Sequence, residues 1–230
     1  MKAIVLAGGF GTRLREKVPN IPKPMAPVAG RPFLEYILDR LVAGGIAEII
    51  LSVGYRANTI IDHFSETYRG VTVNYAIETE PLGTGGAIVH ALHESSNAPV
   101  LILNGDTFLN IDFEELIHWY KENPVPIAMV LKKVPDTSRY GSVLLSGEKV
   151  VGFEEKGKCG PGLINAGVYI VQANVFKKLG FSGKFSFETE FLQKQCAVLA
   201  TRAFITDAYF IDIGIPEDYE RAQFELPTVI

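Results

Sequence analysis

A glycine-rich turn directly after a short apolar run constrains this chain more than any other feature. Residues 3–6 are apolar, Gly8, Gly9 and Gly11 follow, and Arg13 completes the stretch. An apolar run that leads into glycines predicts a buried strand and a tight turn. Glycines leave backbone N–H groups uncovered for phosphate oxygens, and a guanidinium adds a fixed, two-pronged positive charge. The stretch therefore predicts a phosphate-binding loop.

A second cation follows in the sequence Pro22-Lys23-Pro24-Met25, where two prolines stiffen the backbone around the lysine. Two common phosphate loops do not fit. A Walker A loop needs Gly-Lys-Ser/Thr where this chain has Arg13, and the dinucleotide-binding pattern needs a third glycine where it has Leu14. We therefore expect a loop that holds a nucleoside triphosphate, with Arg13 and Lys23 directed at its phosphates.

Strand and helix patterns alternate over the first half of the chain. Apolar runs predict strands at 3–6, 48–53, 71–77 and 100–103. Between and after them we expect a helix that begins at Pro32 and stops before Gly44, and helices at 57–64, at 84–93 and from Asp112. This alternation predicts right-handed βαβ units and a Rossmann-like, mostly parallel sheet flanked by helices, with ligands at the carboxyl ends of the strands.

The second half of the chain has more predicted strands and fewer helices than the first. Short strand-like runs at 127–131, 141–145, 149–153 and 163–171 predict a β-rich lobe, followed by a helix at 188–195, a strand at 198–205 and a helix at 216–226. No linker or change in composition separates the halves. We expect one domain over residues 1–230, with halves at about 1–123 and 124–230.

Composition excludes several classes of protein. The net charge is −4 and the basic residues are dispersed, which argues against nucleic-acid binding. Cys159 and Cys196 offer neither a metal-binding spacing nor a disulfide framework, and no apolar run approaches the roughly 20 residues of a membrane helix. We expect a cytoplasmic protein without nucleic-acid or membrane partners.

The stretch Gly-Gly-Phe-Gly-Thr-Arg-Leu, followed by Pro-Lys-Pro-Met, resembles the opening of the sugar-1-phosphate nucleotidylyltransferases. The resemblance covers essentially the whole chain. It implies the nucleotide-diphospho-sugar transferase fold with a β-rich sugar-binding lobe, and transfer of a nucleotidyl group from a nucleoside triphosphate to a sugar 1-phosphate. It also implies Arg13 and Lys23 as catalytic cations. The residues it assigns to the nucleotide in this loop are Leu6, Ala7, Gly8, Gly9, Gly11 and Thr12.

Two aspartates follow apolar runs in distant parts of the sequence. Asp106 comes after the strand predicted at 100–103, and Asp212 follows Tyr209-Phe210-Ile211. An aspartate at the end of a strand is often only a turn or helix cap. Two carboxylates are also what Mg²⁺ needs to bridge substrate phosphates, and both fall where the resembling family has metal-binding aspartates. We expect a Mg²⁺ cofactor on Asp106 and Asp212.

The segment 75–86 resembles the base-recognition loop of the family, with Glu78, Pro81 and Gly83 as its contacts. A carboxylate accepts the N1–H and N2 amino donors that lie on one edge of guanine, whereas uracil and thymine present carbonyl oxygens beside a single N–H. Glu78 therefore predicts GTP as the nucleotide. UTP or dTTP is the alternative, and so is a solvated turn with incidental acids.

The resemblance also places residues around the sugar phosphate. Asn104, Gly141, Glu155, Lys156 and Asn165 are the implied contacts. Taken alone, these stretches read as a charged hairpin and an interior strand. His90 and His93 stand at helical spacing without an evident third ligand, so we expect no metal there.

Within the family, the similarity is strongest to members that use GTP and D-glycero-α-D-manno-heptose 1-phosphate. Guanylyltransferases of mannose 1-phosphate and short uridylyltransferases of N-acetylmuramate 1-phosphate are alternatives. A silent regulatory subunit would be expected to lack Arg13, Lys23 or an aspartate, all of which are present. An NAD-dependent oxidoreductase is a further class. The chain could form homo-oligomers.

Overall fold

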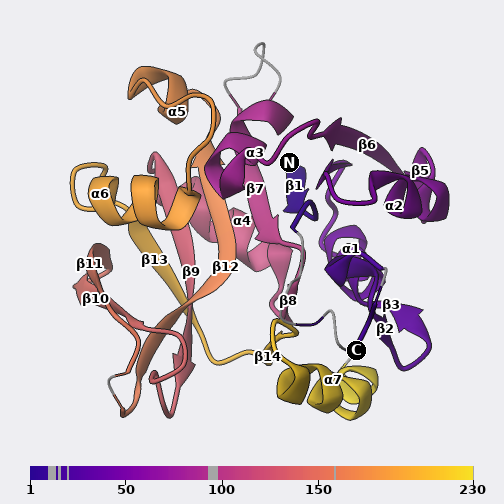
Figure 1. The fold of residues 1–230 in the computed structure, drawn as a ribbon. Helices are drawn as coiled ribbons and strands as arrows, with labels where there is room; N and C mark the ends of the chain where they lie inside the picture. The colour runs from indigo at the N-terminus through magenta and orange to yellow at the C-terminus, as the bar shows by residue number, and fades with distance from the viewer. Residues whose placement is uncertain (10–13, 15–16, 20, 93–97, 158, 230) are drawn as a thin grey trace.

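The computed structural model describes residues 1–9, 14, 17–19, 21–92, 98–157 and 159–229. Most of its strands belong to one sheet: β1 (Lys2–Leu6), β4 (Glu48–Val53), β5 (Thr67–Tyr68), β6 (Val71–Ile77), β7 (Pro99–Asn104), β9 (Ile127–Val134), β10 (Ser142–Ser146), β11 (Lys149–Glu154), β12 (Gly162–Gln172) and β13 (Arg202–Thr206). They pair in the order β10-β11-β13-β9-β12-β7-β1-β4-β6-β5 (Figure 1).

The first half of the chain forms the parallel part of this mixed sheet. β7, β1, β4 and β6 are neighbours and run parallel. The helices of this half are α1 (Phe33–Ala43), α2 (Ala57–Phe64), α3 (Gly83–Ala91) and α4 (Phe113–Glu122). Ala3, Ile4 and Val5 of β1 are each 0% exposed and alternate between two hydrophobic clusters, one on each face of the sheet. Burial on both faces explains why this strand reads as a continuous apolar run.

The predicted start of α4 is confirmed in detail. The side chain of Asp112 accepts hydrogen bonds from the backbone N–H groups of Glu114 and Glu115, at 2.8 and 3.2 Å. These are two of the donors that the first turn of a helix leaves without an internal partner.

The second half extends the sheet with antiparallel strands. β12 lies between β7 and β9 and is antiparallel to both, so it joins the two halves through one continuous sheet. Tyr169 of β12 packs edge-on against Phe187, with ring centroids 4.9 Å apart, in an aromatic cluster over that face. The helical segments here are α5 (Val175–Lys178), the π-helix η3 (Phe187–Leu192) and α6 (Gln193–Gln195).

Two predictions for this half need correction. The strand predicted at 198–205 begins only at Arg202, because Ala200 and Thr201 donate backbone hydrogen bonds to Ala197 and Cys196 in a turn. Val198, counted as a strand residue, has 77% of its surface exposed. The helix predicted at 188–195 is a π-helix followed by one short α-helical turn. Apolar content alone did not distinguish these conformations.

Several short elements complete the fold. They are the 3₁₀ helix η2 (Lys23–Met25), the strands β2 (Pro27–Val28), β3 (Arg31–Pro32), β8 (Thr107–Leu109) and β14 (Phe210–Asp212), and the last helix α7 (Pro216–Val229). β8 pairs with β14, and β2 pairs with β3. α7 lies against β2, since Tyr219 and Gln223 both donate hydrogen bonds to the backbone oxygen of Pro27. In Figure 1, α7 and β14 lie close to β8 at one end of the molecule.

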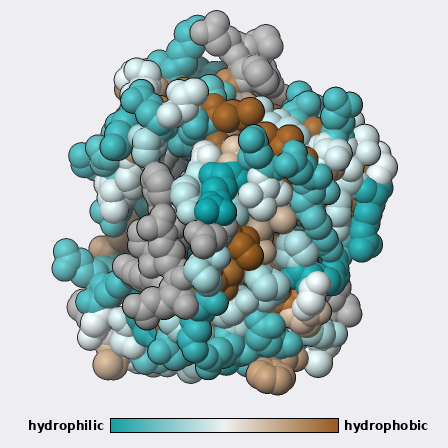
Figure 2. Space-filling model, turned by 45° about the vertical axis from the view of Figure 1, so that its right-hand side comes forward, coloured by the Kyte–Doolittle hydropathy of each residue, from teal (hydrophilic) through white to brown (hydrophobic). Residues whose placement is uncertain are grey.

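None of the helices in the described part of the chain has the length and apolar character needed to cross a membrane. The face drawn in Figure 2 is largely hydrophilic, with hydrophobic residues in small separate patches.

Candidate active site

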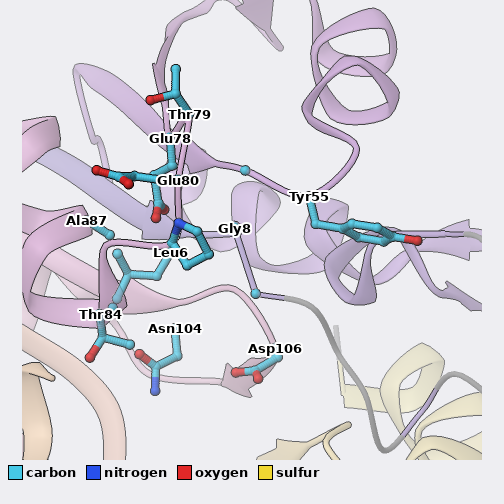
Figure 3. A pocket seen from close by; sticks show the side chains of 14 residues that line it. Leu6, Gly8, Tyr55, Glu78, Thr79, Glu80, Thr84, Ala87, Asn104 and Asp106 are labelled. Carbon is cyan, nitrogen blue, oxygen red and sulfur yellow. The ribbon is translucent and has the colours of Figure 1, made fainter. Parts of the chain in front are cut away.

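A cavity of ≈ 490 Å³ opens at the carboxyl ends of the parallel strands. It is lined by Leu6, Gly8, Gly9, Gly54, Tyr55, Glu78, Thr79, Glu80, Pro81, Gly83, Thr84, Ala87, Asn104 and Asp106. In Figure 3, Glu78 and Glu80 lie at one end of this group and Asn104 and Asp106 at the other. The location is the one that parallel-sheet topology favours for ligands.

The cavity brings together eight of the residues proposed from the sequence: Leu6, Gly8, Gly9, Glu78, Pro81, Gly83, Asn104 and Asp106. Ala7 does not line it, because its side chain is buried and its N–H bonds to the oxygen of Ser52. Gly11, Thr12 and Arg13 lie outside the described residues. Gly54 and Tyr55 were missed, although they follow the carboxyl end of β4 and the same topological rule could have indicated them.

Gly8 is where the backbone of the loop comes closest to the base-recognition segment. A Cβ atom at this position would lie 2.7 Å from Oε1 of Glu78 and 3.3 Å from the backbone nitrogen of Gly54. Such distances are well inside van der Waals contact. Glycine at position 8 therefore allows β1, β4 and β6 to present their ends to one narrow space.

Glu78 is held in place by the protein itself. Its Oε1 accepts a hydrogen bond from Ser52 Oγ at 3.3 Å, and its Oε2 accepts one from the backbone N–H of Leu82 at 3.1 Å. A carboxylate has about four lone-pair sites, so each oxygen keeps the capacity to accept one further donor. The carboxylate is thus fixed in orientation and still able to bind a donor in the cavity.

The turn that leads into α3 depends on Gly83. Its φ is +71°, and a Cβ atom there would lie 2.5 Å from the backbone oxygen of Phe185. Both facts exclude a side chain without local rearrangement. Thr84, which follows, donates a hydrogen bond to Glu188 at 2.6 Å and accepts one from the N–H of Phe187 at 2.9 Å. The base-recognition turn is therefore tied to the π-helix of the second half.

Lys23, Asp106 and Asp212 form a second charged group beside the cavity. Lys23 Nζ lies 2.6 Å from Asp106 Oδ2 and 3.6 Å from Asp212 Oδ1, and only 12% of the lysine side chain is exposed. The pairing of β8 with β14 explains why the two aspartates lie close together. Asp106 immediately precedes β8, and in the β8–β14 pair Thr107 stands opposite Asp212. The two aspartates proposed as a pair are therefore neighbours.

These carboxylates fit a divalent metal in their chemistry. Carboxylate oxygens are the ligands that Mg²⁺ prefers, and the ammonium group between them shows that the pair accepts a cation. Burial raises the pKa of Asp212 above its ordinary value of 3.8, Asp106 raises it further, and Lys23 opposes the shift. Within the described residues no third His, Cys, Asp or Glu completes a metal cluster. Other ligands would come from substrate phosphates and water.

The residues proposed for the sugar phosphate lie in two places. Asn104 lines the cavity, and its Oδ1 is buried without a hydrogen-bond partner among the described residues. Asn165 donates to Tyr169 Oη at 2.6 Å and accepts from the N–H of Gly167. Glu155 and Lys156 are exposed in the turn after β11 and, like Gly141, do not line the cavity.

The remaining candidates are peripheral. His90 is exposed and lies within hydrogen-bonding distance of the backbone oxygen of Ile77. His93 lies outside the described residues. Cys159 is exposed and Cys196 is buried, and neither forms a disulfide.

Comparison with known proteins gives the family. A family model described as "Nucleotidyl transferase" matches residues 2–228. The D-glycero-α-D-manno-heptose 1-phosphate guanylyltransferase of Aneurinibacillus thermoaerophilus is 45% identical over 100% of both chains. The enzyme of the same name from Campylobacter jejuni is 46% identical over 95% of this chain and 97% of its own.

The crystal structure of HddC from Yersinia pseudotuberculosis in complex with GMP-PN is 38% identical. It matches with a TM-score of 0.86 over 98% of this chain and 99% of that one. The predicted fold and the predicted resemblance are thereby confirmed. The chain belongs to the nucleotidyl transferase family and has the nucleotide-diphospho-sugar transferase fold.

Proposed function

We propose that this protein transfers a guanylyl group from GTP to D-glycero-α-D-manno-heptose 1-phosphate, giving a GDP-sugar and pyrophosphate. The observation that carries the reaction type is the group formed by Lys23, Asp106 and Asp212 at the edge of a nucleotide-sized cavity. The choice of substrates is supported by the two relatives of 45% and 46% identity, whose names give this activity.

The reaction is an in-line displacement at phosphorus. An oxygen of the sugar phosphate attacks the α-phosphorus of GTP, and pyrophosphate leaves. The protein has to align two anions that repel each other and to stabilise the charge that develops. In this proposal Lys23 contacts the α-phosphate. Arg13 and the backbone N–H groups of the glycine-rich loop, from Gly8 to Thr12, bind the phosphates that leave.

Asp106 and Asp212 would hold Mg²⁺. Bound there, the ion would neutralise phosphate charge and orient the two substrates. The ammonium group of Lys23 lies near both carboxylates in this structure, so the lysine and a bound Mg²⁺ ion would interact with the same two negative charges. The side chains that bind the metal are thus also the ones that position the catalytic ammonium.

Glu78 is the proposed guanine contact. Its orientation is set by Ser52 and Leu82, which leaves the carboxylate with lone pairs for the N1–H and N2 donors of guanine. Uracil or thymine would place a carbonyl oxygen against this carboxylate, an unfavourable arrangement. Pro81 and Gly83 shape the turn beside it.

Asn104, Gly141, Glu155, Lys156 and Asn165 are the proposed contacts of the sugar phosphate. Asn104 supports this assignment most directly, because its buried carbonyl oxygen has no partner among the described residues and is suited to accept a hydrogen bond from a ligand hydroxyl. We further propose that residues 1–230 act as one catalytic domain in the cytoplasm, since one sheet runs through both halves and the substrates are soluble metabolites.

The test is a survey of pyrophosphate release with four nucleoside triphosphates and a panel of sugar 1-phosphates. We expect GTP with the heptose 1-phosphate to give the highest kcat/KM, ahead of mannose 1-phosphate and ahead of UTP or dTTP. Lys23→Ala should lower turnover by about two orders of magnitude or more, because a cation at the transition state is lost. Failure of every substrate pair, or unchanged turnover in Lys23→Ala, would overturn the proposal.

A further inference from the structure

The loop between β9 and β10, residues 135–141, contacts two parts of the proposed active site: the turn with Glu155 and Lys156, and the segment that carries Asp212. On one side it supports the turn that carries Glu155 and Lys156. The N–H of Gly157 donates to the oxygen of Ser138 at 3.0 Å, and the N–H of Thr137 donates to the oxygen of Gly160 at 3.0 Å. The position of this loop therefore sets the position of the proposed sugar-phosphate turn.

Gly141, the last residue of the loop, makes this contact tight. A Cβ atom there would lie 2.7 Å from the backbone oxygen of Glu154 and 3.5 Å from the nitrogen of Lys156. The backbones of the loop and the turn are therefore closely packed at this point.

On its other side the same loop contacts the segment that carries Asp212. The ring of Tyr140 packs edge-on against Phe210 of β14, with centroids 5.8 Å apart. Arg139 forms an ion pair with Asp218 in the first turn of α7, with Nη1 3.4 Å from Oδ1 and Nη2 bonded to Oδ2. Two consecutive side chains, Arg139 and Tyr140, thus connect the β9–β10 loop of the proposed sugar-binding half (about 124–230, here called the sugar lobe) to the segment that carries Asp212.

Asp218 is well suited to fix this connection. It is only 2% exposed, and a buried carboxylate without partners is unfavourable. Two guanidiniums, from Arg139 and Arg221, pair with it. Arg221 belongs to the same helix, α7, so its pairing cannot orient one part of the site relative to another. Arg139 comes from the sugar lobe and can.

We propose that Arg139 and Asp218 are a positioning pair that sets the sugar-phosphate turn at a fixed distance from Lys23, Asp106 and Asp212. This inference rests on the proposed function, since it assigns the turn to the sugar phosphate. The pair does not line the cavity. It acts by restricting how the β9–β10 loop sits against β14 and α7, so that attacking and accepting groups meet in the correct geometry.

The paired variants are Arg139→Met and Arg221→Met; the second also removes the contacts of Arg221 with Glu225 in the same helix. Each removes one guanidinium from the same carboxylate and leaves the other, so both leave Asp218 with one partner. Both arginine side chains are about half exposed, at 48% and 51%, which favours folding of both variants. Only Arg139→Met breaks the link between the lobe and the helix.

Steady-state kinetics of the full chain, with each substrate varied in turn, give the readout. For Arg139→Met we expect KM for the sugar 1-phosphate to rise about tenfold, with KM for GTP within about twofold of wild type. Arg139→Lys should recover only part of the loss, because an ammonium cannot make the two-pronged contact. Arg221→Met should leave both KM values within about twofold.

A double variant separates positioning from general loss of stability. Once Asp218→Asn has weakened the pair, adding Arg139→Met should change KM for the sugar 1-phosphate by less than about twofold. Equal effects of Arg139→Met and Arg221→Met, or a parallel rise in both KM values, would overturn the positioning role. If the wild-type protein shows no nucleotidyl transfer at all, the proposed function is what fails, and the two failures are distinct.

Discussion

Removal of the Lys23 ammonium tests whether the lysine and a metal ion share the same pair of carboxylates. Lys23→Met keeps the length and apolar character of the side chain and deletes its charge. In the metal-free protein this leaves Asp106 and Asp212 facing each other without a cation. Breaking a fully buried pair costs about 3–5 kcal/mol, and an exposed pair about 0–1 kcal/mol.

The structure places this pair between those limits. The lysine side chain is 12% exposed, but the two aspartate side chains are 40% and 37% exposed, so water reaches the carboxylates that remain. We therefore expect a loss of about 1–2 kcal/mol in metal-free buffer. For a chain of this size 1 kcal/mol shifts Tm by about 2–4 °C, so Tm should fall by roughly 2–8 °C.

Thermal unfolding with chelator and with MgCl₂ is the assay. Mg²⁺ should raise Tm more in Lys23→Met than in wild type, because no ammonium has to be displaced from the carboxylates. Lys17→Met is the control: Lys17 pairs with Glu220 at 2.8 Å on the surface, and we expect no measurable change in Tm. Equal Tm values for Lys23→Met and wild type in chelator, or the same Mg²⁺ effect in both, would refute the reasoning.

The effect of Lys23→Met on Tm should also depend on pH in a defined direction. Burial and Asp106 raise the pKa of Asp212 in the folded protein above 3.8, so folding favours the protonated form of this carboxyl group. The contribution of Asp212 to the free energy of unfolding is therefore fully present below pH 3.8. The contribution is lost as pH rises through the raised folded pKa. Without Lys23 this pKa should rise further. The Tm difference between Lys23→Met and wild type should therefore be largest at neutral pH and should shrink on acidification; a difference that grows on acidification would contradict this.

Three further predictions concern single side chains. Asp106→Asn and Asp212→Asn should each raise the Mg²⁺ concentration needed for half-maximal activity, and unchanged metal dependence in both would make these aspartates structural. Glu78→Gln should reduce the preference for GTP over UTP by roughly five- to 150-fold, corresponding to about 1–3 kcal/mol, in kcat/KM measurements that leave KM for the sugar 1-phosphate unchanged. Gly83→Ala should destabilise the protein by about 1–3 kcal/mol in denaturant unfolding, because its φ is +71° and the new Cβ would meet the oxygen of Phe185; wild-type stability would contradict this.

The local pattern of the sequence was enough to predict the parallel half of the sheet. β1, β4 and β7 are nearly continuous apolar runs because they are buried on both faces, and burial of that kind leaves a signal in any window of the sequence. β6 is buried on one face only, and its apolar residues alternate with polar ones. The capped start of α4 at Asp112 is similarly local, since the cap and its donors lie within three residues.

The segment 196–201 shows where local pattern fails. The apolar residues of 198–205 suggested a strand that begins at Val198, yet Val198 is exposed and the backbone turns through hydrogen bonds to Cys196 and Ala197. A short apolar run has no periodicity that separates a strand from a turn packed on one side. The helix predicted at 188–195 is present, but its sequence pattern did not distinguish a π-helix from an α-helix.

By itself, the sequence determined the α/β class and the family, because glycine spacing, the proline-flanked Lys23 and buried runs are encoded in adjacent residues. Only the tertiary structure showed how the charged side chains are brought together. Asp212 reaches Asp106 and Lys23 through β8 and β14, strands of three residues that are too short to show a period of two. Arg139 meets Asp218 across 79 residues of chain. Contacts of this kind depend on how distant segments pack, and that is a property of the folded chain as a whole.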